Sequence, residues 1–479
     1  MAYPSEDLLG KLGERLGPKG FTRDPEAMAP SLRDWRGRYH GAAAAMLSPA
    51  TREEVAAIVA LCAAAGVPLV PQGGNTSMVG GATPDSSGEA LLLSLRRMDS
   101  IRGIDPQAGI AVCEAGVILA NLHEAANQAG LRFPLSLGAK GSATVGGLVS
   151  TNAGGTQVLR FGTMRSLVLG IEAVLPDGSL YEGLTALKKD NRGYDLKQLL
   201  IGAEGTLGVV TAATLKLVPA AGARAVAWVG VASPAEAQAL LRKLEGTPGD
   251  AVESFEIVPA NVLELVLAHI PGTRAPLARP APWNVLVEAV SPVGAPEPDL
   301  AEALTGASVL DAAIAASEAQ AEAFWRLRDS IAEAERQAGP AAKHDISVPV
   351  GTMGAFMTEA AAAVEERFPG TRVIAFGHLG DGNVHFNVQA PPGAPGAWLE
   401  TTGAEVTRLV HDLVTAAGGS ISAEHGIGQA RVSELQRLAD PARLGALRAI
   451  KRALDPRGIM NPGKLVPIQD ILAPEPLPS

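Results

Sequence analysis

The sequence is poor in cysteine, and this excludes several classes of redox protein. Its two cysteines, Cys62 and Cys113, lie far apart in apolar stretches of the 479-residue chain. They form neither a metal-binding nor a redox spacing, so they are predicted to be small buried side chains in a reducing compartment. Haem-attachment and iron–sulfur motifs and the glycine fingerprint of an NAD-binding domain are missing as well.

Long apolar runs and an excess of positive charge are also absent. No uncharged run reaches the length that spans a membrane, and the N-terminus lacks the basic and apolar regions of a signal peptide. The formal net charge of −10 argues against a nucleic-acid or anionic membrane surface as partner. The protein is therefore expected to be cytoplasmic, and an anionic substrate would need a local cationic pocket.

The residues that are present suffice for several hydrophobic cores. With 479 residues, 47% of them hydrophobic, the chain is predicted to form two or three domains. Thr51 and Glu54 belong to a capping box for a helix that ends at Gly66, and a strand at 67–70 leads into a glycine-rich loop. Further elements are expected at 90–95 and 109–114 (strands), 119–129 (helix) and 199–217 (a loop, then a strand).

From about residue 220 the pattern changes to alternating strands and helices. Ser233 and Pro234 form a capped helix start. Strands are predicted at 225–231, 251–258 and 283–290, surface loops at 271–282, 291–298 and 391–397, and a frayed tail at 473–479. This alternation predicts a second, α+β domain built on an antiparallel sheet.

Three glycine-rich, nearly uncharged segments lie between residues 71 and 210. The first, 71–81, directly follows a strand and places glycines around Asn75, Thr76 and Ser77, a composition suited to aiming N–H groups and hydroxyls at phosphate oxygens. The second covers 138–155 and the third 201–210. One such loop is as easily a tight surface turn, but three together predict a long ligand cradled by backbone.

The segment 372–388 predicts a β-hairpin that carries two histidines. Two apolar, β-prone arms flank a Gly-Asp-Gly-Asn turn at 380–383. His378 and His385 would then lie near each other at the turn end of the arms. The two-residue period of a strand puts His385 and Asn387 on the same face.

These histidines, with a carboxylate from a later segment, form a candidate metal site. Two converging imidazoles are what a divalent transition metal needs, and Glu424, beside a third histidine at His425, offers the carboxylate. One histidine alone would more often be structural, but the set together favours a site. Asp381 is left out, because an aspartate in a turn usually binds its own backbone.

The three glycine-rich segments, together with NRGYDLK at 191–197, resemble the FAD-binding domain of the vanillyl-alcohol oxidase/p-cresol methylhydroxylase superfamily. The resemblance covers essentially the whole chain and is greatest to the D-lactate and D-2-hydroxyglutarate dehydrogenase branch. It implies an α+β fold, with a two-subdomain FAD-binding domain of this type and an α+β substrate (cap) domain on an antiparallel sheet. The implied parts are an N-terminal helical segment (1–40), the FAD-binding domain (41–219), the substrate domain with the metal site (220–440) and a C-terminal segment that returns to the FAD domain (441–479).

The resemblance also implies how FAD is held. Some relatives attach the flavin covalently through a histidine in the first loop, and because this loop has none, FAD is expected to be non-covalent. The 71–81 loop would hold the pyrophosphate, 138–155 would line the diphosphate and isoalloxazine, and the segment near 208–210 would lie at the adenine end. The residues expected to contact FAD are Pro71, Gly73, Gly74, Asn75, Thr76, Ser77, Gly80, Gly81, Gly141, Thr144, Gly147, Asn152, Gly154, Gly155, Glu204, Gly208, Val210 and Asn461.

For the substrate domain, the resemblance implies a metal and an anion-binding pair. His378, His385 and Glu424 would bind a divalent metal, taken as zinc, although manganese and iron(II) suit the same ligands. The residues assigned to substrate binding and catalysis are Arg328, Lys343, Asn387 and the acid/base His425. The segment with Arg328 is expected at the start of a helix, and Lys343 on a strand; Arg and Lys suit a carboxylate chemically. Ala332 stands where animal D-2-hydroxyglutarate dehydrogenases have a substrate-contacting threonine.

Together these features predict an FAD-dependent, metal-assisted dehydrogenase that oxidises a D-2-hydroxy acid. D-2-Hydroxyglutarate is the first candidate, with D-malate beside it, and the electrons would pass to an external acceptor such as electron-transfer flavoprotein, a quinone or a cytochrome. The alternatives are oxidation of D-lactate or glycolate, which a missing spare cation for a second carboxylate would favour, and a flavin subunit of a glycolate oxidase-like complex. A metal-dependent hydrolase with purely structural glycine loops is the least favoured. A homodimer is left open.

Overall fold

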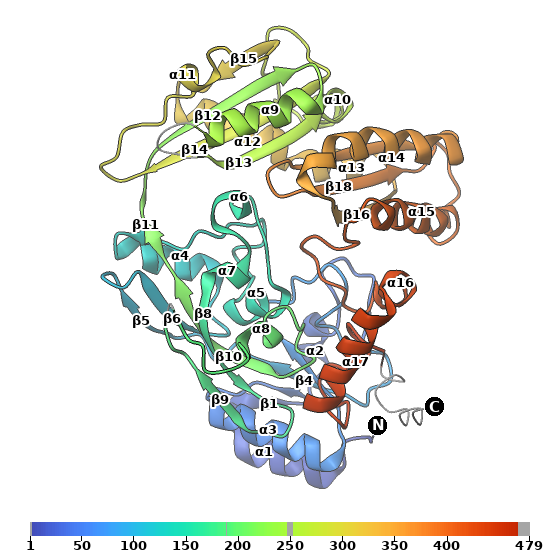
Figure 1. Cartoon of the computed structure of the whole chain (residues 1–479). Coiled ribbons are helices and arrows are strands. Elements are labelled where there is room, and N and C mark those ends of the chain that lie inside the picture. Colours follow the sequence, from blue (N-terminus) through green and yellow to red (C-terminus); the bar gives the residue numbers. More distant parts are fainter. Residues whose placement is uncertain (1, 188, 247–251, 468–479) are drawn as a thin grey trace. The chain divides into compact units, whose positions relative to one another are not determined.

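The computed structural model describes residues 2–187, 189–246 and 252–467, and it divides into two compact units (Figure 1). Unit 1 contains Met1–Gly155, Gly162–Pro219 and His425–Ser479, and unit 2 contains Thr156–Phe161 and Ala220–Glu424. The chain therefore passes from one unit to the other at 155/156, 161/162, 219/220 and 424/425. The expected tail at 473–479 lies outside the described residues, and the borders of the functional domains stay predictions. No described helix is both long and apolar enough to cross a membrane.

The first sheet of unit 1 has the order β1-β2-β4-β3. Its strands are β1 (Phe21–Thr22), β2 (Met46–Leu47), β3 (Leu69–Gln72) and β4 (Leu91–Ser94), and β4 runs parallel to both β2 and β3. Helices α1 (Glu6–Gly20) and α3 (Arg52–Ala65) bury leucine, valine and isoleucine side chains in the same core as this sheet. Both cysteines are buried, as predicted.

The capping box at the start of α3 is confirmed in substance. The Thr51 hydroxyl accepts a hydrogen bond from the Glu54 N–H at 3.1 Å, while the Glu54 carboxylate accepts from the N–H of Ala50 at 2.6 Å. The helix ends at Gly66 in the left-handed conformation. The strand that follows begins two residues later than predicted, because the N–H of Val67 still caps the helix by donating to Cys62 O.

The second sheet of unit 1 is antiparallel, in the order β5-β6-β10-β8-β9. Its strands are β5 (Ile101–Asp105), β6 (Ile110–Glu114), β8 (Val168–Val174), β9 (Leu180–Gly183) and β10 (Val209–Lys216), and β7 (Leu131–Arg132) pairs with β11 (Val218–Pro219). The remaining helices of the unit are α2 (Pro25–Met28), η1 (Ala29–Ser31), α4 (Leu119–Gln128), α5 (Val145–Thr151), α7 (Met164–Leu167), α8 (Lys197–Leu200), α16 (Val432–Leu438) and α17 (Pro441–Leu454). Helix α5 lies within the second glycine-rich segment, 138–155.

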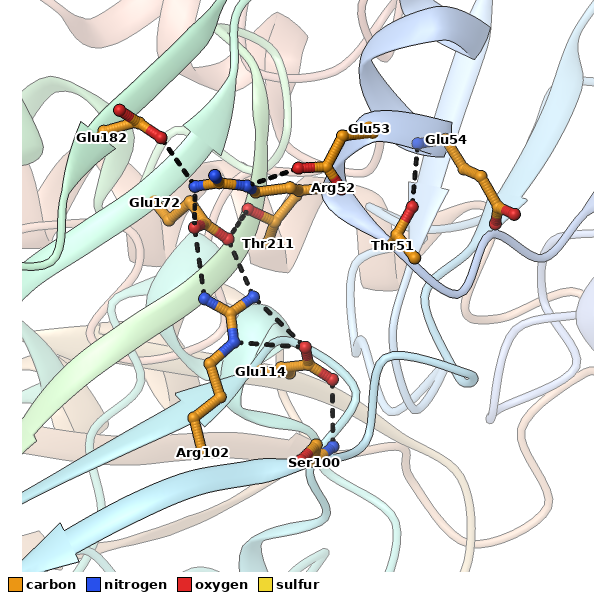
Figure 2. A network of polar contacts seen from close by, with 10 residues as sticks. All are labelled: Thr51, Arg52, Glu53, Glu54, Ser100, Arg102, Glu114, Glu172, Glu182 and Thr211. Carbon is orange, nitrogen blue, oxygen red and sulfur yellow. Dashed lines mark hydrogen bonds and ion pairs between the residues drawn. The ribbon is translucent and has the colours of Figure 1, made fainter.

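A buried glutamate fixes the start of α3 to the second sheet (Figure 2). Glu172 on β8 is 1% exposed, and its carboxylate accepts from Arg52 of α3, Arg102 of β5 and Thr211 of β10. Glu182, on β9, also forms an ion pair with Arg52. Burial opposes ionisation of Glu172, but the hydrogen bonds from Arg102, Thr211 and Arg52 hold its pKa below the usual value.

The end of the described chain completes unit 1. Met460 forms a parallel bridge with Leu69, with backbone hydrogen bonds of 2.8 Å from Leu69 N–H to Ile459 O and from Asn461 N–H to Leu69 O. The buried Lys451 ammonium donates to Thr206 O, to Met460 O and to Asp455. The segment after α17 is thereby tied both to β3 and to the third glycine-rich segment.

Unit 2 is built on one antiparallel sheet in the order β15-β12-β14-β13-β17-β18-β16, which confirms the predicted sheet. Its strands are β12 (Ala221–Val231), β13 (Val252–Pro259), β14 (Trp283–Pro292), β15 (Asp311–Ile314), β16 (Ala341–Ser347), β17 (Arg372–His378) and β18 (Asn383–Gln389). The hairpin at 372–388 is therefore confirmed. The loop predicted from 291 was placed too early, because β14 continues to pair Pro292 with Ala221.

Helices cover both faces of this sheet. On one face lie α9 (Pro234–Glu245), α11 (Leu300–Leu304), α14 (Met353–Arg367) and α15 (Thr402–Ala416), and on the other α10 (Ala260–His269), α12 (Glu318–Asp329) and α13 (Ile331–Ala338). The short elements α6 (Val158–Phe161) and η2 (Val350–Thr352) also belong to this unit. The strand residues alternate between the two cores: Val373 and Ala375 face the first, and Ile374 and Phe376 the second.

Candidate functional site

A cavity opens among the glycine-rich segments of unit 1. Its lining includes these predicted FAD contacts: Pro71, Gly73, Ser77, Gly81, Gly147, Glu204, Gly208 and Val210. The others do not line it: Gly74, Asn75, Thr76, Gly80, Gly141, Thr144, Asn152, Gly154, Gly155 and Asn461. The Asn461 amide reaches two lining residues, because it donates to Gly81 O and Glu204 O. The three segments thus meet at one cavity, as a cradle for one ligand requires.

Close packing of the loops explains two of the glycines. A Cβ on Gly73 would lie 2.2 Å from the Thr144 hydroxyl, and one on Gly74 would lie 1.8 Å from Ser142 O. These glycines therefore allow the first loop to touch the second, which the sequence alone attributed to the ligand. Two buried oxygens nearby, Thr144 Oγ1 and Asn461 Oδ1, have no partner among the described residues. Polar atoms of this kind fit a polar ligand such as FAD.

Several polar residues of these loops hold the backbone in unusual conformations. Asn75, Asn152, Glu204 and Asn461 all have positive φ angles, between 42° and 53°. The Asn75 amide donates to Pro30 O and Arg33 O, and the Asn152 side chain accepts from the N–H of Arg165. Such strain persists only where surrounding contacts impose it, and it concentrates at functional sites. These side chains fix the shape of the loops.

Glu204 connects the third glycine-rich segment to the segment after residue 425. Its two carboxylate oxygens accept from the N–H groups of Ile427 (2.8 Å) and Gly428 (2.7 Å). Its carbonyl oxygen accepts from the Asn461 amide at 2.7 Å. Burial raises the pKa of Glu204, although the two N–H groups oppose this. The carboxylate therefore ties the third glycine-rich segment to residues 427 and 428.

In unit 2 the predicted metal and substrate residues share one face of the sheet. Glu256 of β13 lies opposite His378 of β17 in the strand register, and His385 of β18 lies opposite Asp345 of β16. Their neighbours along each strand point into the first core, so these side chains point to the face that α10, α12 and α13 cover. Lys343 and Asn387 form the next opposed pair on the same face. The two-residue period therefore gathers the site.

His378, His385 and Glu424 form a group with metal-binding geometry. One potential ligand atom from each lies within 4.8 Å of the others, which small side-chain rotations can close around an ion. Burial raises the pKa of Glu424 to about 7, with Asp345 and Asp381 adding to the rise and His378 opposing it. Two imidazoles and a carboxylate are a ligand set that fits a divalent transition metal.

A buried carboxylate that the sequence analysis missed supports His378. Glu256, 1% exposed, lies with Oε1 2.5 Å from His378 Nδ1 and accepts from Arg328 Nε through Oε2 at 2.8 Å. Burial would lower the pKa of His378, but Glu256 outweighs it and raises the pKa to about 9. Burial would raise the pKa of Glu256, but Arg328 and His378 hold it at about 2. The available sequence signal was that Glu256 lies between Phe255 and Ile257 on a predicted strand, although that strand also contains Glu253 and Ser254.

Asp345, also missed, positions the segment that carries Glu424. Its Oδ2 accepts from the Glu424 N–H at 2.9 Å, and its Oδ1 accepts from Asn383 at 2.9 Å and lies 3.8 Å from His385 Nδ1. Ser420 pairs with Ser347 at the end of β16, so the chain runs along this edge strand to Glu424. His425 follows directly and belongs to unit 1. Asp381 accepts from the N–H of Asn383 at 2.9 Å, the backbone role expected of it.

The predicted anion-binding residues are each paired with a buried acid. Arg328 binds Glu256, and Lys343 lies 3.2 Å from Glu335, which also accepts from the Asn387 amide at 2.8 and 3.0 Å. Burial raises the pKa of Glu335. Arg328 was expected at the start of a helix but lies in the last turn of α12, because Ser317 caps that helix eleven residues earlier. Ala332 is exposed on α13.

Comparisons with known proteins match both halves of the chain. A family model described as FAD linked oxidases, C-terminal domain, matches residues 221–465, and one described as FAD binding domain matches residues 43–183. The mitochondrial D-2-hydroxyglutarate dehydrogenase of Arabidopsis thaliana is 35% identical over 459 residues, covering 95% of this chain and 80% of that protein. The D-2-hydroxyglutarate dehydrogenase of Xanthomonas citri pv. viticola is 37% identical over 452 residues, covering 93% and 94%.

A solved structure supports the fold. The crystal structure of p-cresol methylhydroxylase with substrate bound has a TM-score of 0.71 and 15% identity, and the match covers 97% of each chain. At this identity the likeness shows the fold alone, and it confirms the expected α+β fold of that flavoprotein type. The compartment in the Arabidopsis protein's name leaves the expected cytoplasmic location without support.

Proposed function

Since this chain belongs to the family of FAD-linked oxidases and is an FAD-dependent dehydrogenase acting on a CH–OH group, we propose that it oxidises a D-2-hydroxy acid with the help of a divalent metal. D-2-Hydroxyglutarate is the first candidate, because relatives over nearly the full chain carry that name, and D-malate is a second dicarboxylate to test. The observation that carries the proposal is the convergence of His378, His385 and Glu424 on a sheet face shared with Arg328 and Lys343.

The cofactor would be non-covalent FAD in the cavity of unit 1. Predicted contacts from all three glycine-rich segments line this cavity, and two buried oxygens close to the lining, Thr144 Oγ1 and Asn461 Oδ1, have no partner among the described residues. FAD, when bound, supplies a two-electron acceptor for the hydrogen on C2 of the substrate. The 71–81 loop contains no histidine, which supports non-covalent attachment.

The metal would be held by the two histidines and the glutamate, with zinc as the first choice. A divalent metal, when bound, supplies a Lewis acid that lowers the pKa of a coordinated hydroxyl. We infer that Arg328, Lys343 and Asn387 orient the carboxylate and hydroxyl groups of the acid, and that His425 accepts the hydroxyl proton. The substrate loses a hydride from C2 and a proton from its hydroxyl, which leaves the 2-oxo acid.

One observation favours a second candidate, the oxidation of a monocarboxylate such as D-lactate or glycolate. Both Arg328 and Lys343 already carry a buried acid partner, Glu256 and Glu335 respectively. A second substrate carboxylate would compete with Glu335 for Lys343, whereas D-lactate has only one carboxylate to place. The site therefore has less spare positive charge for a dicarboxylate than the sequence suggested.

The electrons would leave through an external acceptor: electron-transfer flavoprotein, a quinone or a cytochrome. The alternative of a flavin subunit within a glycolate oxidase-like complex differs in one respect, because such a subunit would need its partners for turnover. A homodimer, and the cytoplasmic location, stay predictions.

The visible spectrum of the purified chain tests the proposal. We expect a yellow protein that is bleached anaerobically by D-2-hydroxyglutarate, D-malate or D-lactate, with bleaching suppressed at least tenfold in rate by prior EDTA and restored by Zn²⁺. Steady turnover with an artificial dye would separate a complete enzyme from a subunit. A yellow protein that none of these acids bleaches would exclude the D-2-hydroxy acid assignment, and EDTA-insensitive bleaching would exclude the metal.

A further inference from the structure

Glu256 contacts both a predicted metal ligand, His378, and a predicted substrate-binding residue, Arg328. It lies on β13 between Phe255 and Ile257, which both point into the opposite core, so its carboxylate points to the face of the site. Oε1 contacts the imidazole of His378 and Oε2 the guanidinium of Arg328, at 2.5 and 2.8 Å. No metal ligand and no substrate contact was predicted at this position.

The contact with His378 decides which of its nitrogens can bind a metal. With Nδ1 held by Glu256, Nε2 is the nitrogen that can serve as the ligand atom toward His385 and Glu424. A metal-bound imidazole usually donates its other N–H to a carboxylate, which fixes the tautomer and the ring orientation. Glu256 meets this requirement and is almost fully buried, so water does not compete for the contact.

The contact with Arg328 extends the same support to the anion-binding side. The guanidinium lies over the ring of Phe376, with its central carbon 5.2 Å from the ring centroid, and is only 13% exposed. The ring face and the carboxylate together restrict the guanidinium to one orientation. One side chain therefore holds both a predicted metal ligand and a predicted substrate anchor.

We propose that Glu256 is a positioning residue that fixes His378 for metal binding through Nε2 and at the same time orients Arg328 for the substrate carboxylate. This inference rests on the proposed function. Asp345 gives a weaker counterpart, since it binds the backbone of Glu424 but lies 3.8 Å from His385 Nδ1. Loss of such a supporting carboxylate costs about 10- to 100-fold in metal affinity in comparable sites.

The test compares Glu256→Gln with Glu253→Gln in the full chain. Glu253 is a matched control, because it is a fully buried glutamate on the same strand that binds an arginine, Arg160 at 2.8 Å, and a glutamine, Gln157 at 3.2 Å. Each protein is stripped with a chelator and titrated with Zn²⁺ by calorimetry. Co²⁺ is then added, and its visible absorption reports the ligand geometry.

We expect Glu256→Gln to raise the Kd for Zn²⁺ by about 10- to 100-fold and to change the Co²⁺ spectrum. Glu253→Gln should lower the melting temperature yet leave the Kd within about twofold. In turnover, Glu256→Gln should also raise KM, because Arg328 loses its partner. Should Glu256→Gln fail to fold, Glu256→Asp, which keeps the charge on a shorter arm, is measured instead, and its Kd should also rise.

Three results would overturn the inference. Wild-type Zn²⁺ affinity and an unchanged Co²⁺ spectrum in the Glu256 variants would show that the carboxylate does not position His378. Equal loss of affinity in Glu253→Gln would show a general effect of disturbing β13. A wild-type chain that binds neither Zn²⁺ nor Co²⁺ would remove the metal from the proposed function itself. The first two results, by contrast, would leave the proposed function intact.

Discussion

Three buried carboxylates in unit 2 each bind two residues at or beside the predicted metal and substrate site. Glu256 joins His378 to Arg328, Asp345 joins Asn383 to Glu424, and Glu335 joins Lys343 to Asn387. A buried charge is costly unless it is paired and hydrogen-bonded, and each of these acids is both near a cation or imidazole and hydrogen-bonded. The buried acids on this face therefore matter as much as the basic side chains that they contact.

Glu335 gives a residue-scale prediction about substrate choice. Replacing it by glutamine removes the charge that pairs with Lys343 and leaves that ammonium free for a second substrate carboxylate. We expect Glu335→Gln to raise kcat/KM for D-2-hydroxyglutarate relative to D-lactate by about tenfold, or about 1.4 kcal/mol. The measurement is steady-state kinetics with both acids and a dye as acceptor.

The control for that experiment is Glu333→Gln on the same helix. Glu333 is 42% exposed and binds Arg336 and Gln337. Its replacement should therefore leave the ratio of kcat/KM for D-2-hydroxyglutarate to kcat/KM for D-lactate unchanged. An equal fall in kcat/KM for both acids in Glu335→Gln would contradict the prediction and indicate that Glu335 only positions Lys343 and Asn387.

At the scale of elements, the charge network around Glu172 holds α3 against the second sheet of unit 1 (Figure 2). Glu172→Ala would leave two arginines without their buried partner. We expect the free energy of unfolding at pH 7 to fall by about 2–4 kcal/mol. This is somewhat less than the roughly 3–5 kcal/mol for a broken, fully buried ion pair, because each arginine side chain is about one-third exposed. Urea unfolding followed by far-UV circular dichroism measures the change.

The same network gives a pH dependence with a defined sign. The pKa of Glu172 is lowered in the folded state, so its contribution to stability is present above the ordinary glutamate pKa of about 4.5 and is lost as the pH falls through the lowered value. The stability difference between wild type and Glu172→Ala should therefore narrow below pH 4.5. Glu182→Gln, which removes an exposed partner of Arg52, should cost little at any pH. A difference that stays constant down to pH 3 would argue against an ionised Glu172.

Elements also show which features a sequence can reveal. The capping of α3 and the hairpin of β17 and β18 depend on residues close together in the chain, and both were predicted correctly. The contact between Glu256 and His378 spans 122 residues, and that between Asp345 and Glu424 spans 79. Strand alternation indicates which face a residue occupies but not which strand lies beside it. The supporting acids therefore emerged only once the order β13-β17-β18-β16 was known.

At the scale of the whole molecule, FAD is expected to stabilise unit 1 and the metal ion is expected to stabilise unit 2. Bound ligand stabilises the folded state by about 2.7 kcal/mol at a concentration 100 times its Kd. Hydrogen exchange with mass spectrometry should show FAD slowing exchange in 71–81, 142–155 and 201–210, and Zn²⁺ slowing it in 372–389 and 420–424. Protection of the hairpin by FAD in the absence of metal, with the glycine-rich segments unchanged, would contradict this assignment.

The discontinuous course of unit 1 also determines an order of events on the ribosome. A nascent chain that has reached Pro219 contains β3 but not Met460, which pairs with that strand. It also contains Glu204, but not Ile427 and Gly428, whose N–H groups donate hydrogen bonds to the Glu204 carboxylate. Unit 2, whose residues end at Glu424, emerges in full before those partners do. Domains generally fold as units during synthesis, in the order in which they emerge. The flavin-binding unit, although its chain is made first, is thus the last to be completed.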